Sequence, residues 1–379
     1  MRLSQFNPYF FMGIYSKNNV FKKYTPCQYK INIYFWPSSI NKKLFNTKRT
    51  HIMKKIIFTL LLAASFVGTA QEKEEKTFSL SGTVDTYFRG NISGGEYDTA
   101  PGSSFANQPG FALGMINLVA AYEGEKVGFV ADMVYGPRGV DAVFNSVGNS
   151  SIVNQLYAYW NVSDKVKLTI GNFNTFLGYE VISPAANFNY STSYLFSYGP
   201  FSHTGLKADF TLSENTSLML AIMNPTDATE YNPTGSYAFG AQLGLSGQYF
   251  NFLYDSGAYE IDFTGGFDVS DTFFLGVNAA YFSGDDAPGF YGAALYPQIA
   301  TSDSFKIGLR TEYFVEDGDF GAIGTGVADS SVFATTLTGN YSIGSLTIIP
   351  ELRLDSASDE AFVGDKALSS FALAAVYSF

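Results

Sequence analysis

Beyond Val67 the sequence has no long hydrophobic run, and beyond Cys27 it has no cysteine. A helix that crosses a membrane needs roughly 20 apolar residues, so this part of the chain contains no candidate transmembrane helix. Without cysteine it can form neither a disulfide framework nor a cysteine-based metal site. Its stability must therefore come from the fold alone.

Basic residues are also scarce once residues 1–70 are set aside. Those residues hold eleven of the 23 Lys and Arg and no Asp or Glu, which leaves 12 basic and 34 acidic residues, a net charge of −22, for residues 71–379. A nucleic-acid-binding protein needs the opposite sign, so we expect no nucleic-acid partner. Aromatic residues make up 17% of the sequence, and abundant aromatics with few charges per segment are typical of a membrane-facing composition.

Residues 53–70 have the anatomy of a secretory signal peptide. Lys54 and Lys55 form a basic start, residues 56–67 are an apolar stretch, and small residues lead up to Ala70. The apolar stretch is too short to span a bilayer; a buried core helix is the alternative interpretation. We therefore expect cleavage after Ala70, which leaves residues 71–76 as a short charged lead-in that begins at Gln71.

Residues 1–52 differ in composition from everything that follows. They hold nine basic residues and no acidic residue, and their apolar residues follow no helical or strand period. Because a working signal peptide lies at the true N-terminus, we predict that the start codon was called too early and that residues 1–52 are not part of the real protein. The alternative is a genuine basic extension.

Strict alternation of apolar and polar residues recurs in blocks of about ten residues after residue 76. In the first block, residues 77–90, Phe78, Leu80, Val84 and Phe88 share one face. The same pattern appears in residues 165–172, 205–212, 259–269 and 304–316. A period of two is the signature of a strand with one apolar face.

The connections between these blocks alternate between short and long. Short turns are expected at 123–126, 162–165, 213–216, 246–248, 269–271, 301–303 and 342–344. Longer links are expected at 90–109, 137–150, 176–202, 225–236, 283–289, 316–330 and 356–366, with one short link near Gly257. This rhythm predicts an all-β fold, a transmembrane antiparallel up-and-down β-barrel of about 16 strands closed between its N- and C-terminal strands, in the bacterial outer membrane. No linker divides residues 77–379, so we expect one barrel domain.

The last residues read as a strand, with Phe371, Leu373, Ala375, Tyr377 and Phe379 on one face. A closed barrel pairs its last strand with its first, so the chain can end inside the sheet. The final strand of a soluble sandwich would explain the alternation but not the terminal Phe. A last strand that ends in Phe resembles the signal read by the outer-membrane barrel assembly machinery, and we assign that signal to Phe371, Tyr377 and Phe379.

The middle of the chain carries four short motifs. They are Gly171-Asn172-Phe173, Gly178-Tyr179-Glu180, Asn187 to Ser191, and the return Gly199 to Gly205. Together they resemble the OmpL-like beta-barrel porin family, closely over about fifty residues and by pattern elsewhere. The resemblance implies an outer-membrane channel and says little about its solute.

The link at 176–202 is long and rich in Asn, Ser, Tyr and Phe. Long loops are uncommon unless they are functional or disordered, and the aromatics argue against disorder. We predict a constriction loop that folds into the pore, with Glu180, Asn187, Asn189 and Tyr190 as its key residues. The alternative is a loop that caps the outside.

Charged residues on the polar faces of the strands are predicted to line the pore. These residues are Arg89, Lys165, Lys167, Lys207, Glu260, Asp262, Lys306, Arg310, Glu312, Glu351 and Arg353. The alternative is a network of paired charges that plugs the barrel, although 16 strands leave room for water. Acidic loops at the mouth, which include Glu96, Asp98, Asp285, Asp286, Glu316, Asp317 and Asp319, predict weak cation preference.

The sequence gives little evidence of a catalytic or metal site. Ser202 and His203 are neighbours and would point to opposite faces of a strand, which argues against a serine hydrolase. Acid-rich segments at 283–289, 316–321 and 355–360 could bind calcium, but none has EF-hand spacing. We therefore expect no catalytic residue, cofactor or metal.

Two function classes remain open. The first is a channel for passive diffusion of small hydrophilic solutes or ions, with outer-membrane lipids and the assembly machinery as partners. The second is a non-conducting structural or adhesive barrel that acts through its extracellular loops. Conductance in a planar bilayer separates the two.

Overall fold

The computed structural model describes residues 77–102, 105–143, 146, 151–284 and 287–379. The predicted extension (1–52), signal peptide (53–70) and lead-in (71–76) lie outside the described residues. Within the described part, no helix combines the length and apolarity needed to cross a membrane.

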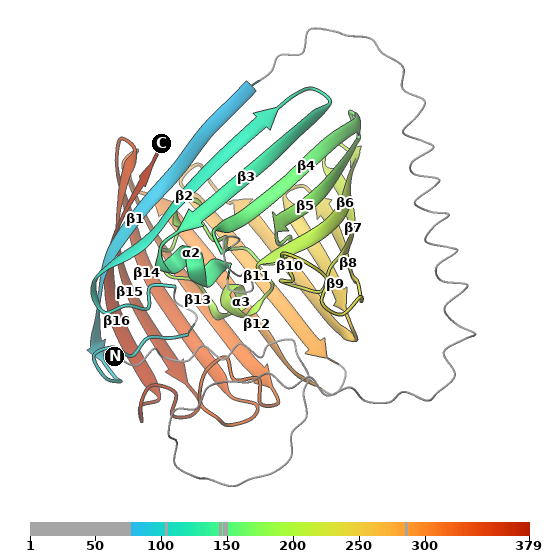
Figure 1. Ribbon diagram of the computed structural model, residues 1–379. Coiled ribbons are helices and arrows are strands. Elements are labelled where there is room, and N and C mark those ends of the chain that lie inside the picture. Colours follow the sequence, from blue (N-terminus) through green and yellow to red (C-terminus); the bar gives the residue numbers. More distant parts are fainter. Residues whose placement is uncertain (1–76, 103–104, 144–145, 147–150, 285–286) are drawn as a thin grey trace, which may run out of the picture. The chain divides into compact units, whose positions relative to one another are not determined.

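The described chain forms a closed antiparallel barrel of 16 strands, each paired with its neighbours in sequence, and β1 pairs with β16 (Figure 1). This confirms the predicted fold class and strand number. The strands are β1 (Thr77–Ser93), β2 (Gly110–Glu123), β3 (Val127–Tyr135), β4 (Val153–Ser163), β5 (Val166–Asn174), β6 (Ser202–Ser213), β7 (Thr216–Met223), β8 (Ala238–Leu245), β9 (Gln248–Asp255), β10 (Ala258–Asp268), β11 (Phe273–Gly284), β12 (Ala287–Ala300), β13 (Phe305–Asp317), β14 (Ser331–Ile343), β15 (Leu346–Ala357) and β16 (Ala367–Ser378).

The connections follow the short–long rhythm, with one correction. The seven short turns and the short β9–β10 link at Ser256-Gly257 lie where the sequence places them. The link expected at 283–289 is shorter, because β11 continues to Gly284 and β12 begins at Ala287. The proline and glycine of residues 287–289 read as a loop but lie in extended backbone beyond a register shift between Phe282 and Gly284.

The alternating pattern separates an outer apolar face from an inner polar face. In β15, Leu352 and Leu354 are 47% and 48% exposed, whereas Glu351, Arg353 and Asp355 between and beside them are buried. The outer residues form the surface that faces lipid, where apolar side chains remain exposed without cost. The inner residues face the interior of the barrel.

The C-terminal residue completes the closing seam. The backbone N–H and C=O of Phe379 both pair with Gly82, at 3.0 Å each. Leu373 and Tyr377 are exposed on the outer face, in register with Phe88 and Val84 of β1. The chain therefore ends within a paired sheet, while the role of these aromatics in assembly stays a prediction.

Two short helices lie within the ring of strands in Figure 1. Helix α2 (Pro137–Ala142) belongs to the link after β3, and α3 (Tyr194–Tyr198) belongs to the link between β5 and β6. The same β5–β6 link also contains a short 3-10 helix, η2 (Pro184–Ala186). Buried apolar side chains join α3 to the walls of β11–β14 and to the later links, among them Leu195, Phe290, Phe314 and Phe320.

Candidate functional site: the lumen and its inward-folded link

The β5–β6 connection, residues 175–201, is called the long link below. Its backbone is held by carboxylates on the inner wall. Glu351 of β15 accepts hydrogen bonds from the N–H groups of Tyr190 (2.9 Å) and Ser191 (3.2 Å). Glu312 of β13 accepts those of Tyr194 (2.9 Å) and Leu195 (2.8 Å) at the start of α3. Carboxylates that accept backbone N–H groups in this way offset the cost of burying their charge.

A third wall carboxylate holds the beginning of the long link. Asp262 of β10 accepts the N–H of Gly178 at 3.1 Å and the side-chain amides of Asn251 and Asn278 at 2.6 Å each. Asn189 adds a side-chain bond to Thr338 of β14 at 2.7 Å. The link therefore contacts the wall at several points around the barrel.

Two buried arginines join the link to the wall through ion pairs and carbonyl groups. Arg310 pairs with Glu180 of the link at 2.7 Å and also donates to the carbonyl oxygen of Ser191. Arg353 pairs with Asp355 at 2.8 Å and donates to the carbonyl oxygen of Thr192 at 2.8 Å. Removing one partner of such a buried pair leaves an uncompensated charge, which is strongly destabilising.

Tyr190 of the link is fully buried, at 0% exposure. Its hydroxyl donates to Asp85 of β1 at 2.6 Å. Burial and the nearby negative charge of Asp85 raise the pKa of Tyr190 well above its usual value, so the hydroxyl keeps its proton. This bond attaches the link to the first strand.

Sequence reasoning missed Arg138, which holds the link from the side of α2. Arg138 is 1% exposed and donates to the carbonyl oxygens of Ile182 (3.2 Å) and Tyr190 (3.0 Å). Its guanidinium lies over the rings of Phe105 and Tyr190, 5.7 Å and 5.3 Å from their centroids. Its only sequence signal is a lone arginine after Gly136-Pro137, in a segment that reads as a loop.

Inward-facing glycines make room for the link's aromatic rings. A Cβ atom on Gly240 of β8 would lie 2.6 Å from the ring of Phe176. Gly276 of β11 and Gly308 of β13 leave the same space for Tyr179 and Phe188. The wall is thus shaped to fit the link.

The structure divides the predicted pore-lining residues into two groups. Seven of them are buried, with exposures of 0–4%: Arg89, Glu260, Asp262, Arg310, Glu312, Glu351 and Arg353. Arg89 donates to carbonyl groups of the β1–β2 connection, and the contacts of Asp262, Arg310, Glu312, Glu351 and Arg353 with the long link are given above. The period-two pattern gives their inward direction correctly. The pattern cannot show that a segment distant in sequence covers these side chains. The sequence predicts that they contact pore water, and the structure buries them instead.

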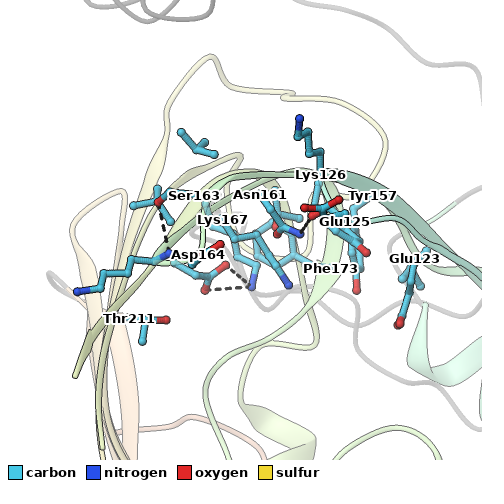
Figure 2. Close-up of a pocket in the computed structure, with 18 of the residues that line it drawn as sticks. Glu123, Glu125, Lys126, Tyr157, Asn161, Ser163, Asp164, Lys167, Phe173 and Thr211 are labelled. Carbon is cyan, nitrogen blue, oxygen red and sulfur yellow. Dashed lines mark hydrogen bonds and ion pairs between the residues drawn. The ribbon is translucent and has the colours of Figure 1, made fainter. Parts of the chain in front are cut away.

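The other group faces open space. Lys165, Lys167 and Lys207 line a cavity of about 800 Å³ on the inner side of β2–β6 (Figure 2). Lys306, near the start of β13, is exposed. The cavity reaches from the short turns Glu123–Lys126 and Ser163–Lys165 to Phe173 and Asn174 at the far end of β5.

The four residues predicted for a constriction also differ from one another. Glu180, Asn189 and Tyr190 make the buried contacts with the wall described above. Asn187 is exposed and bonds within the link, to the N–H (2.9 Å) and carbonyl oxygen (2.6 Å) of Val181. Asn187 therefore shapes the link rather than attaching it.

His203 is buried, and its contact is with Thr175 of the long link rather than with the neighbouring Ser202. Its Nε2 lies 3.0 Å from the Thr175 hydroxyl, and its Nδ1 has no partner among the described residues. Across the described ranges, no group of three or more His, Cys, Asp or Glu side chains is arranged to hold a metal ion. Glu316 of the acidic segment 316–321 is buried and accepts the N–H of Ile323 at 2.8 Å.

Comparisons with known proteins agree with this architecture. The structure resembles the outer-membrane channel DcaP of Acinetobacter baumannii, with a TM-score of 0.55, 15% identity, and coverage of 83% of this chain and 100% of that one. It also resembles an anion-selective porin from Comamonas acidovorans, with a TM-score of 0.53, 10% identity, and coverage of 80% of this chain and all of that one. At these identities the likeness concerns the fold.

A search of curated protein sequences finds no match. The family model described as "Putative beta-barrel porin-2, OmpL-like" matches residues 77–379, which is the whole barrel. The chain therefore belongs to the OmpL-like beta-barrel porin family and is a porin-like channel of the outer membrane.

Proposed function

We propose that this channel passes small hydrophilic solutes and ions by passive diffusion along the wall of β4–β6, beside a long link that acts as a fixed constriction. The observation that carries the proposal is the division of the interior. Buried contacts fill the side of β10–β16, whereas Lys165, Lys167 and Lys207 border an open cavity of about 800 Å³. Solutes follow the side where water has room.

The constriction role of the long link is supported by its attachments. Glu351, Glu312 and Asp262 hold its backbone from three strands. A segment held at several separated points keeps one position, because these hydrogen bonds offset the entropic cost of ordering its backbone. We propose that it narrows the lumen and leaves the cavity side as the path.

Accessible single cysteines test this path. The barrel contains no cysteine, so Lys167→Cys and Tyr157→Cys, both at cavity positions, each give one reactive thiol. A bulky thiol-reactive label should lower single-channel conductance in planar bilayers for these two variants. Leu352→Cys, on the lipid face, is the matched control and should show no change.

Absence of any KCl conductance in the unlabelled protein would overturn the channel proposal and favour a non-conducting structural or adhesive barrel. Conductance that the label at positions 157 and 167 leaves intact would place the path elsewhere. These two results are distinct, so each part of the proposal can fail by itself.

We further propose that a cleaved signal peptide, residues 53–70, exports the protein, and that the assembly machinery recognises the last strand through Phe371, Tyr377 and Phe379. The pairing of Phe379 with Gly82 supports the second part. Deleting residues 377–379 should leave the protein degraded or in the periplasm, as judged by membrane fractionation. Normal outer-membrane levels of the truncated form would contradict this role. N-terminal sequencing of membrane material should find Gln71 first.

A further inference from the structure

The cavity beside β2–β6 has charges of both signs, and they are separated. Glu123 ends β2 and Glu125 lies in the following turn, whereas Lys165 lies in the turn just before β5 and Lys167 is the second residue of that strand. Figure 2 shows Glu123 and Glu125 toward one side of the cavity and Thr211 toward the other. One acidic end and one basic end therefore face the same space.

The charges at both ends are free to meet a ligand. Within the described part of the chain, Glu123, Glu125, Lys165 and Lys167 form no ion pair, whereas Lys207 pairs with Asp209 at 3.4 Å. Each end also holds one opposite charge in its turn, Lys126 or Asp164. The net charge is therefore −1 at the β2–β3 end and +1 at the β5 end.

The wall between the two ends is aromatic and rich in hydrogen-bonding groups. Tyr157 and Tyr159 of β4 line it, with Gln155 and Asn161 on the same strand. The ammonium of Lys167 lies over the ring of Tyr159, 4.8 Å from its centroid. This contact steadies Lys167 and leaves N–H groups for another acceptor.

The spacing of the two ends limits the size of a ligand that reaches both. Three strand spacings separate β2 from β5, which is about 14 Å along the wall. Side chains reach into the cavity from both sides, and a peptide chain spans roughly 3.3–3.6 Å per residue. The charges of a single amino acid lie too close together, whereas two to four residues fit.

We infer that this cavity is a binding subsite for short zwitterionic peptides of two to four residues, whose carboxylate binds at Lys167 and Lys165 and whose ammonium binds at Glu123 and Glu125. The volume of about 800 Å³ is that of a small-molecule pocket. The tyrosines of β4 contact the peptide between its ends. This inference rests on the proposed function only in that the subsite borders the diffusion path.

Capped peptides test the need for both charges. The probe is trialanine, titrated into the detergent-solubilised mature protein at low ionic strength and followed by ligand-observed NMR. N-acetyl-trialanine lacks the ammonium and trialanine amide lacks the carboxylate, so each should bind up to about fivefold more weakly, the upper end of the range that one exposed ion pair supplies. Free alanine should bind no better than the capped forms. Equal binding of free and capped trialanine would overturn the inference.

A charge swap gives a second test that a merely structural role would not pass. Lys167→Glu and Glu123→Lys should each weaken trialanine binding, because one end then repels its group. The double variant should bind nearly as well as the native protein, since the peptide can bind in the reverse direction. Lys366→Gln, in the exposed β15–β16 link, is the control and should leave binding unchanged. A double variant weaker than both single variants would contradict the subsite.

The same preparation is tested for KCl conductance in a bilayer. Conductance without trialanine binding would overturn the peptide subsite and leave the proposed channel intact. Trialanine binding without conductance would overturn the proposed channel and leave the peptide subsite intact.

Discussion

Wall carboxylates and buried arginines act as attachment points for the long link. Glu351 and Glu312 accept backbone N–H groups, and Arg310 and Arg353 donate to backbone carbonyl groups. A buried charge is tolerated when hydrogen bonds replace its lost hydration. Lys167 is the contrasting case, because its ammonium lies over the ring of Tyr159 and borders the open cavity. A side chain that points toward the lumen therefore does not always contact the water in it.

Asp227 provides a pH-sensitive attachment at the end of the long link. It lies in the β7–β8 connection and accepts the N–H groups of Phe201 (2.9 Å) and Ser202 (2.8 Å). Burial raises the pKa of Asp227 to about 6, partly opposed by these two hydrogen bonds. Because the folded pKa lies above the unfolded value of 3.8, this group stabilises the fold most below pH 3.8. That contribution is lost as the pH rises through about 6.

We therefore expect the native protein to gain more thermal stability than Asp227→Asn when the pH falls from 7 to 5. Asparagine resembles the protonated acid and tolerates the positive φ of 57° at this position. The measurement is the melting temperature of the detergent-solubilised barrel at both pH values. An identical pH response in the two proteins would show that Asp227 does not titrate in this range.

At the scale of elements, the long link and the glycines beneath it form one packing unit. Gly308 of β13 lies under Phe188, and a Cβ at this position would overlap the ring. We expect Gly308→Ala to displace the link at a cost of about 1–3 kcal/mol, the usual range for overpacking. Hydrogen exchange measured by mass spectrometry should then be faster at the amides of residues 186–192.

Gly90→Ala is the matched control for that substitution. The added Cβ would lie 3.7 Å from the ring of Phe88, an ordinary contact, so link amides should exchange at the native rate. Unchanged exchange in Gly308→Ala would mean that the link does not depend on this close fit.

The sequence predicts those elements that residues close together in the chain determine. The period of two in residues 304–316 depends on neighbouring residues alone, so β13 and the inward direction of Arg310 and Glu312 follow from it. The contact of Arg310 with Glu180 joins residues 130 positions apart, and no local pattern encodes it. Arg138 is missed for the same reason, since the carbonyl groups to which it donates belong to Ile182 and Tyr190 of the long link.

At the scale of the whole barrel, closure between β1 and β16 leaves no unpaired edge within the membrane. This explains how a cysteine-free domain is stabilised, since every strand pairs on both sides. It also explains why the interior can hold so many charges. The sheet encloses them, and the inward-folded link supplies backbone groups that pair with them.

The charges that remain in contact with water predict the ion preference. Glu96, Asp98 and Asp319 in the longer links and Asp317 at the end of β13 are exposed, whereas Glu316 is buried and adds little to the field at the mouth. Asp285 and Asp286 lie outside the described residues. The cavity holds four acidic and four basic side chains. We therefore expect weak cation preference at low salt. The preference should decline as added salt shortens the Debye length toward about 3 Å at 1 M.

Reversal potentials under a tenfold KCl gradient measure this preference. Changing Lys167 and Lys207 together to Glu should strengthen the cation preference, because both side chains line the open cavity. The same reversal at Arg310 and Arg353 should instead lower the yield of folded barrel, since breaking a buried pair costs about 3–5 kcal/mol. A well-folded Arg310→Glu, Arg353→Glu double variant with altered selectivity would show that these arginines line the conducting path. In that case the long link would have to leave the wall of β13 and β15 in the open channel.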